Sequence, residues 1–172
     1  MSPERRRRLG DVVTAELVRH FMAEQRCLYP TARRVLRGRG RTTMREHRER
    51  IETERALRKL GRMNPAKPEF SRQFETVIRM ARRHMRNEEQ NLFPTIRTTC
   101  SPHELRELGH RVRIVMDAAP TRPHPEMPNQ PILLGMLSPF VGFMDKIRDL
   151  MTGRPTSRRE LRRRHKPLIG PS

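Results

Sequence analysis

The sequence carries one short motif twice, and this repeat constrains the fold more than any other feature. Each copy reads His-x-x-x-Glu-x-x-x-Leu-aromatic-Pro, over residues 20–30 and 84–94. On an α-helix, a spacing of four residues places two side chains one turn apart on the same face. The repeat therefore predicts two helices that each present a histidine beside a carboxylate, His20 with Glu24 and His84 with Glu88.

Both motifs lie within apolar stripes of helical spacing. The stripes consist of Val13, Leu17, Phe21 and Leu28 in the first copy, and Phe74, Val77, Ile78, Ala81 and Met85 in the second. A carboxylate on the buried side of a helix is costly unless something pairs with it. A metal ion is one partner that satisfies a histidine and a carboxylate together.

For a single copy, an ordinary hydrogen bond between histidine and glutamate would be the simpler interpretation. Two matching copies on apolar faces favour metal binding instead. Histidine nitrogen and carboxylate oxygen suit iron, manganese or zinc, and the sequence has no cysteine cluster that would favour a thiolate zinc site.

The charge balance of the chain points to a different class of partner. The 172 residues include 38 basic and 19 acidic side chains, for a formal net charge of +19. Such a charge is typical of nucleic-acid binding. Two observations weaken this interpretation. The arginines are spread over every predicted helix, and aromatic residues, which stack on bases, are only 4% of the chain. The best candidates for phosphate contacts are in the tail: Arg158, Arg159, Arg162, Arg163 and Arg164.

Other sequence features concern the cellular setting. No apolar run is long enough for a membrane span, and the N-terminus shows no secretory signal. Cys27 and Cys100 are too few for a disulfide framework, so we expect reduced thiols and a cytoplasmic location.

The hydropathy pattern divides the chain into four parts. We expect a disordered basic start over 1–10, a helical bundle over 11–118, a proline-rich linker with an amphipathic helix over 119–153, and a disordered basic tail over 154–172. The first bundle helix contains Pro30, which predicts a kink or a restart there. The last begins with a capping box formed by Ser101 and Glu104.

Together with Arg45-Glu46-His47 between them, the two motifs resemble the hemerythrin-like (HHE cation-binding) family. The resemblance implies an all-α, up-and-down helical bundle around a non-haem iron centre, often with two irons and bridging carboxylates. Carried over residue by residue, the resemblance implies the metal ligands His20, Glu24, His47, His84 and Glu88. An alignment anchored on Leu57 and Leu60 would put Arg50, instead of His47, at the ligand position of the middle helix.

The family's first helix, with its own histidine, should lie upstream of Asp11, where only residues 1–10 stand. We therefore expect a bundle that lacks this helix and one ligand. A helix over residues 140–151, or a second copy of the chain in a homodimer, would cover the open side. A misassigned start codon or a decayed gene are the other interpretations.

The resemblance implies iron binding, as a mono- or di-iron centre, with O2, NO or peroxide as the small molecule handled at the metal. Manganese and zinc are the alternative ions. The competing hypothesis is a metal-deficient bundle that binds nucleic acid or protein through its basic tail. No nucleophile paired with a base marks the chain as a hydrolase or transferase.

Overall fold

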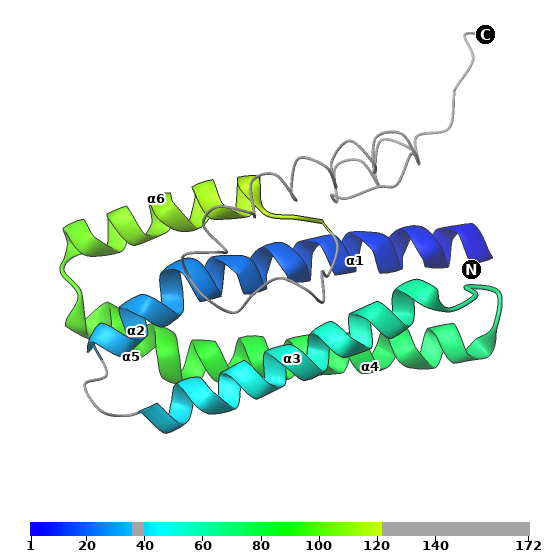
Figure 1. Ribbon diagram of the computed structural model, residues 1–172, viewed down its shortest axis with the longest axis horizontal. Helices are drawn as coiled ribbons and strands as arrows, with labels where there is room; N and C mark the ends of the chain where they lie inside the picture. Colours follow the sequence, from blue (N-terminus) through cyan, green and yellow to red (C-terminus); the bar gives the residue numbers. More distant parts are fainter. Residues whose placement is uncertain (36–39, 122–172) are drawn as a thin grey trace, which may run out of the picture.

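The computed structural model describes residues 1–35 and 40–121, and for residues 40–47 it describes the backbone helix only. The predicted linker beyond residue 121, the helix over 140–151 and the basic tail lie outside the described residues. Every element within the described ranges is helical (Figure 1), which confirms the predicted all-α bundle.

Four long helical stretches make up the described part of the chain. The first comprises α1 (Pro3–Ala23), the π-helical segment η1 (Glu24–Leu28) and α2 (Tyr29–Val35). The second is α3 (Gly40–Arg62). The third comprises α4 (Pro68–Asn87), the π-helical segment η2 (Glu88–Leu92) and α5 (Phe93–Thr99), and the fourth is α6 (Pro102–Ala118).

The start of α1 corrects the prediction of a disordered segment over 1–10. Ser2 caps the helix by accepting a hydrogen bond from the backbone N–H of Arg5, and Pro3 occupies the first turn. Arg7 donates to the carbonyl oxygens of Leu60, Gly61 and Met63, which end α3 and begin the following turn. These contacts are between distant segments, so the local charge pattern could not reveal them.

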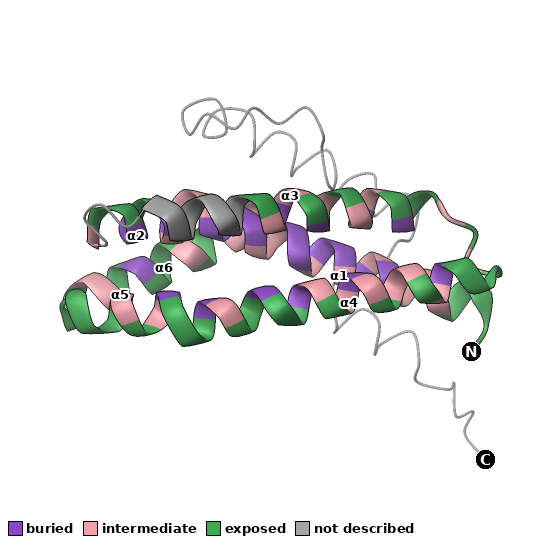
Figure 2. Cartoon of the chain, turned by 90° about the horizontal axis from the view of Figure 1, so that it is seen from below, coloured by how far each residue is buried: buried purple, intermediate pink, exposed green. Residues whose placement is uncertain are grey.

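The main core lies where α1, α3 and α4 meet. Figure 2 shows the buried residues of these helices facing one another, with the exposed residues outside. Leu57 and Leu60 on α3 and Phe70 on α4 are among its fully buried side chains. The cluster consists of Leu17, Phe21, Leu57, Leu60, Phe70, Val77 and Ala81. Burying such side chains supplies about 1.5–3 kcal/mol each, so this core holds the three helices in register.

The helix α6 packs on the other side of α1 from α3 and α4 (Figure 1). It begins with the predicted capping box, in which Ser101 accepts from the N–H of Glu104 and Glu104 accepts from the N–H of Ser101. Its apolar face closes a second cluster, in which Leu108 packs with Cys27, Leu92 and Ile96. This cluster ties α6 to η1 and η2, the segments that carry the two glutamates.

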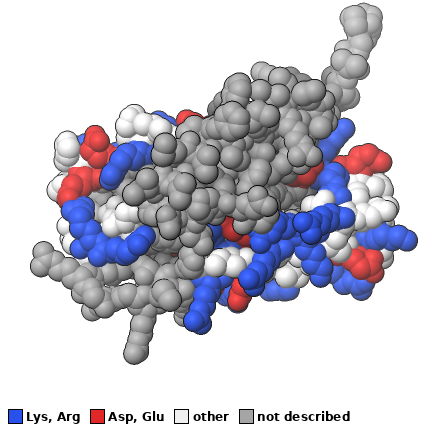
Figure 3. All heavy atoms as spheres, viewed as in Figure 1, with Lys and Arg blue, Asp and Glu red and all other residues white. Residues whose placement is uncertain are grey.

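Lys and Arg side chains are spread over the described helices on the face seen in Figure 3, with Asp and Glu between them. This distribution agrees with the expectation that the arginines are not gathered on one helix. None of the described helices has both the length and the apolar character required to cross a bilayer.

Candidate metal centre

Four side chains from the two motifs meet between the first and the third helical stretch. His20 lies on α1 and Glu24 begins η1, whereas His84 lies on α4 and Glu88 begins η2. Each residue offers one nitrogen or oxygen atom, and these four atoms all lie within 4.8 Å of one another. The helix pairing thus brings together residues that are far apart in the sequence.

Glu24 has the shortest contacts in this cluster. Its Oε1 lies 2.6 Å from Nε2 of His20 and 2.9 Å from Nε2 of His84. Oε2 of Glu88 faces the same two nitrogens at 3.4 Å and 3.7 Å. The imidazole rings are close to perpendicular, with centroids 5.7 Å apart. Two nitrogens and two oxygens therefore surround one small volume.

Each glutamate is the first residue of a π-helical segment, in which a backbone hydrogen bond spans five residues instead of four. The N–H of Tyr29 donates to the carbonyl of Glu24, and the N–H of Phe93 donates to the carbonyl of Glu88. The proline after each aromatic residue has no N–H with which to continue the α-helical ladder. The shared ending of the two motifs thus accounts for a register change at both carboxylates.

The cluster is buried on every side but one. The side chains of Glu24 and Glu88 are 0% and 1% exposed and that of His84 is 2% exposed, whereas His20 is 28% exposed. Phe21 covers His84 edge-on, with ring centroids 5.5 Å apart. Removing two carboxylates from water carries a penalty of several kcal/mol each unless cations or donors compensate it. Of these four side chains only His20 is partly accessible to solvent, and its Nε2 atom, which faces the cluster, is itself buried.

The outer oxygens of the two carboxylates differ in their environment. The buried hydroxyl of Tyr29 donates to Oε2 of Glu24 at 2.9 Å. The equivalent residue of the second motif is Phe93, which has no hydroxyl, and Oε1 of Glu88 has no hydrogen-bond partner among the described residues. The motif pattern assigned no role to Tyr29 and so did not predict this contact. The available signal was that Tyr29 is the sole tyrosine of the chain.

The ionisable groups of the cluster perturb one another strongly. Burial lowers the pKa of His20, but Glu24 and Glu88 outweigh burial and raise it to about 10. Burial raises the pKa of Glu24, but His20 and His84 together hold it well below its usual range. The pKa of Glu88 is raised, mainly by burial and also by the negative charge of Glu24. Without a metal ion, the protonated imidazole of His20 therefore offsets part of the negative charge of the two glutamates.

The donor set fits a divalent metal ion of the first transition row. Imidazole nitrogen and carboxylate oxygen are the ligands such ions take in helical bundles. Nε2 of His20 lies within 2.6 Å of a carboxylate oxygen, yet it forms no hydrogen bond of acceptable geometry with a described residue. This nitrogen is close to a carboxylate oxygen but does not donate a hydrogen bond to it. That arrangement is the one expected if both atoms bind the same cation.

Comparison with known proteins identifies the family. The Hemerythrin HHE cation binding domain matches residues 2–96. The chain belongs to the hemerythrin HHE cation-binding family. An uncharacterized hemerythrin-like protein of Schizosaccharomyces pombe is 25% identical over 137 residues, which are 79% of this chain and 68% of that protein. No solved structure matches the chain significantly.

Of the five residues that the hemerythrin resemblance implies as ligands, the structure brings four together. The fifth, His47, lies on α3, but its side chain is outside the described part of the chain. Arg50, one turn later, is only 4% exposed and forms an ion pair with Glu54. The alternative alignment, with Arg50 at the ligand position of the middle helix, therefore has a buried side chain at that place.

Other candidate residues of this hemerythrin-like chain lie outside the cluster. His103 and His110 are exposed on α6, away from the four donors. Cys27 is buried and forms no disulfide, and burial raises the pKa of its thiol, so it serves as a small apolar side chain in the core.

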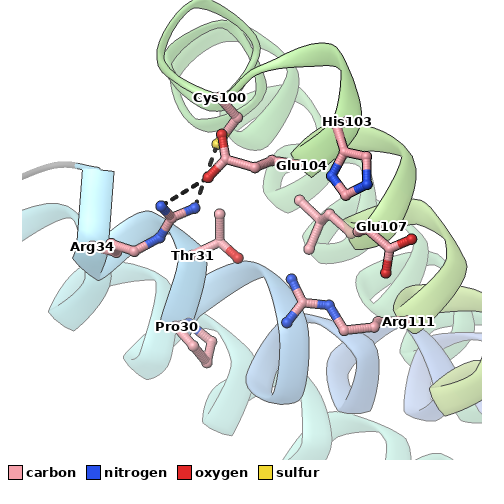
Figure 4. Close-up of a pocket in the computed structure, with 9 residues that line it drawn as sticks. Pro30, Thr31, Arg34, Cys100, His103, Glu104, Glu107 and Arg111 are labelled. Carbon is pink, nitrogen blue, oxygen red and sulfur yellow. Dashed lines mark hydrogen bonds and ion pairs between the residues drawn. The ribbon is translucent and has the colours of Figure 1, made fainter.

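A pocket of about 530 Å³ lies between α2 and α6 (Figure 4). Arg34 crosses its mouth, where it donates to Glu104 at 2.9 Å and contacts the Cys100 sulfur at 4.0 Å. Arg111 and Glu107 add one charge of each sign to the lining. Because opposite charges balance within the lining, the pocket favours no single class of ligand.

Proposed function

We propose that this protein binds a non-haem iron ion with His20, Glu24, His84 and Glu88 as protein ligands. The observation that carries this proposal is the convergence of these four donors, three of them on buried side chains, within 4.8 Å of one another. Family membership supports cation binding. The choice of iron over manganese or zinc depends on the hemerythrin resemblance, because the donor set suits all three ions.

We further propose that the ion binds O2 or NO, or reacts with peroxide, on the side of His20. Bound iron would supply redox chemistry and an open coordination position. Two neighbouring side chains hold the ligands in place. Phe21 packs edge-on against His84, and the hydroxyl of Tyr29 donates a hydrogen bond to the outer oxygen of Glu24. The side chain of His20 is 28% exposed and that of Glu88 is 1% exposed, so we expect a small molecule to approach the centre from the side of His20.

The two buried, free cysteines fit a reducing compartment, and we propose a cytoplasmic location on that basis. The competing hypothesis, a metal-deficient basic binding module, depends on residues 154–172, which are outside the described residues. The homodimer likewise stays a prediction. Neither has a supporting contact in the described structure.

Anaerobic reconstitution tests the proposal. The metal-free chain is incubated with Fe(II), freed of excess iron, and analysed for metal content. It is then exposed separately to air, NO and peroxide while absorption spectra are recorded. We expect stoichiometric iron and a spectral change with at least one of the three. Glu24→Gln should lose the iron, and Glu16→Gln, on the exposed part of the same helix, should keep it. Iron well below one equivalent in the parent chain would refute the proposal.

A further inference from the structure

The helix α3 packs beside α1 and α4, which carry the cluster, and its inner face includes a positively charged side chain, Arg50. Thr53, Leu57 and Leu60 on this face are 2%, 0% and 1% exposed. Arg50 continues the same stripe by one helical turn and is 4% exposed. A buried arginine at this position is unusual, because such side chains are almost never buried unless paired. Its partner is Glu54, one turn later on the same helix.

The helix register places Arg50 at the level of the metal ligands. Gly10 of α1 lies opposite Leu60 of α3, since a Cβ atom on Gly10 would lie 3.7 Å from the Leu60 side chain. The two helices run in opposite directions (Figure 1), so moving from Leu60 back to Arg50 corresponds to moving from Gly10 forward to His20. A second contact agrees with this register. On α4, Arg83, which precedes the ligand His84, lies 3.9 Å from Glu49, which precedes Arg50.

We infer that the centre holds one metal ion per chain, because Arg50 occupies the position on α3 from which a ligand would bind a second ion. The inference rests on the proposed function and adds the number of ions. Two-metal sites place their ions about 3.5–4 Å apart, and each ion needs donors of its own. A guanidinium stays charged at all relevant pH values and has no lone pair to donate. It therefore repels a nearby dication and cannot bind it.

The contacts of the four donors agree with a single ion. Metal–ligand distances of about 2.0–2.2 Å place opposite donors of one ion about 4 Å apart, close to the 4.8 Å that encloses this cluster. A carboxylate that bridges two ions with one oxygen on each needs both of its oxygens turned toward the ions. In Glu24 the outer oxygen already accepts the hydrogen bond of Tyr29, so only its inner oxygen faces the cluster.

A metal titration of the full chain tests the inference. The metal-free protein is titrated anaerobically with Co(II), with absorption spectra and equilibrium dialysis as readouts. We expect saturation at one Co(II) per chain. Saturation at two would overturn the inference and leave the proposed function intact. No binding at all would instead refute the proposed function itself, so the two failures are distinct.

Variants of α3 test the assignment to Arg50. Arg50→His replaces the fixed charge by a donor and should raise the capacity from one Co(II) to two. Arg55→His adds a histidine to the exposed side of the same helix and should leave the capacity at one. His47→Ala should also leave it at one. A folded Arg50→His chain that still binds one ion, or a His47→Ala chain that binds none, would contradict the assignment.

Discussion

Nε2 of His84 lies 2.9 Å from Oε1 of Glu24, although 60 residues separate the two in the sequence. The contact joins the second copy of the motif to the first. It places a histidine from one helix against the carboxylate of the other, and both side chains are almost completely buried. The two copies therefore form one mixed set of donors rather than two independent His–Glu pairs.

Because Glu24 makes the shortest contacts with both histidines, its carboxylate should be the least replaceable group of the centre. We predict that Glu24→Gln lowers metal affinity by more than the about 10- to 100-fold typical of losing an outer hydrogen bond to a ligand. Competition with a coloured chelator measures the affinity. Glu16→Gln, which removes an ion pair with Arg19 that is partly exposed and outside the cluster, is the matched control. Equal affinities in the two variants would exclude Glu24 as a ligand.

The Tyr29 hydroxyl should tune the centre without binding the metal. Tyr29→Phe removes the hydrogen bond to Oε2 of Glu24, and we expect metal affinity to fall about 10- to 100-fold. Denaturant unfolding of the metal-free variant should show a loss of about 1.5–3 kcal/mol, the usual net value of a hydrogen bond to a charged group. A stability loss with unchanged affinity would mean that the hydroxyl only supports the fold.

Two glycines should respond to alanine in opposite directions. A Cβ atom on Gly10 would lie 3.1 Å from Cζ of the fully buried Phe70, so Gly10→Ala should destabilise the chain by about 1–3 kcal/mol. Gly109 lies within α6 with no atom within 4 Å of such a Cβ, so Gly109→Ala should stabilise it by about 0.5–1 kcal/mol. Thermal unfolding of both variants checks the pair, and a stable Gly10→Ala chain would contradict the packing of α1 on α4.

Metal binding should release protons near neutral pH. Glu24 and Glu88 raise the pKa of His20 to about 10, so its imidazole is protonated at pH 7 in the metal-free chain. A metal ion binds only the neutral imidazole. The apparent affinity should therefore increase as the pH rises, by about tenfold per pH unit for each proton displaced.

Calorimetry in two buffers of different ionisation enthalpy, both at pH 7, measures this proton count. The observed binding enthalpy should differ between the buffers by the difference in their ionisation enthalpies multiplied by the protons released. Identical enthalpies would show that His20 is already neutral before the metal binds.

The repeated motif made much of this structure predictable. Spacing alone put His20 with Glu24 and His84 with Glu88 on helix faces. The apolar stripes indicated that those faces are buried, although Met85 of the second stripe is 39% exposed. The capping box of Ser101 and Glu104 was readable because it involves only neighbours along the chain. These features have local sequence signals, and their burial follows from helical periodicity.

Other features depend on contacts that no local pattern encodes. The start of α1 is ordered by Arg7, whose acceptors belong to the end of α3. Pro30, which predicted a kink or a restart, is instead preceded by a π-helical segment that begins six residues earlier, at Glu24, and the α-helix continues from Tyr29. The burial of Arg50 likewise depends on how α3 docks on α1 and α4.

The most direct test of the account is anomalous diffraction from crystals of the full chain grown with a single divalent metal, with data collected at the absorption edge of that metal. The account predicts one anomalous peak per chain, in contact with His20, Glu24, His84 and Glu88. Crystals that contain the metal but show no peak among these four side chains would contradict it.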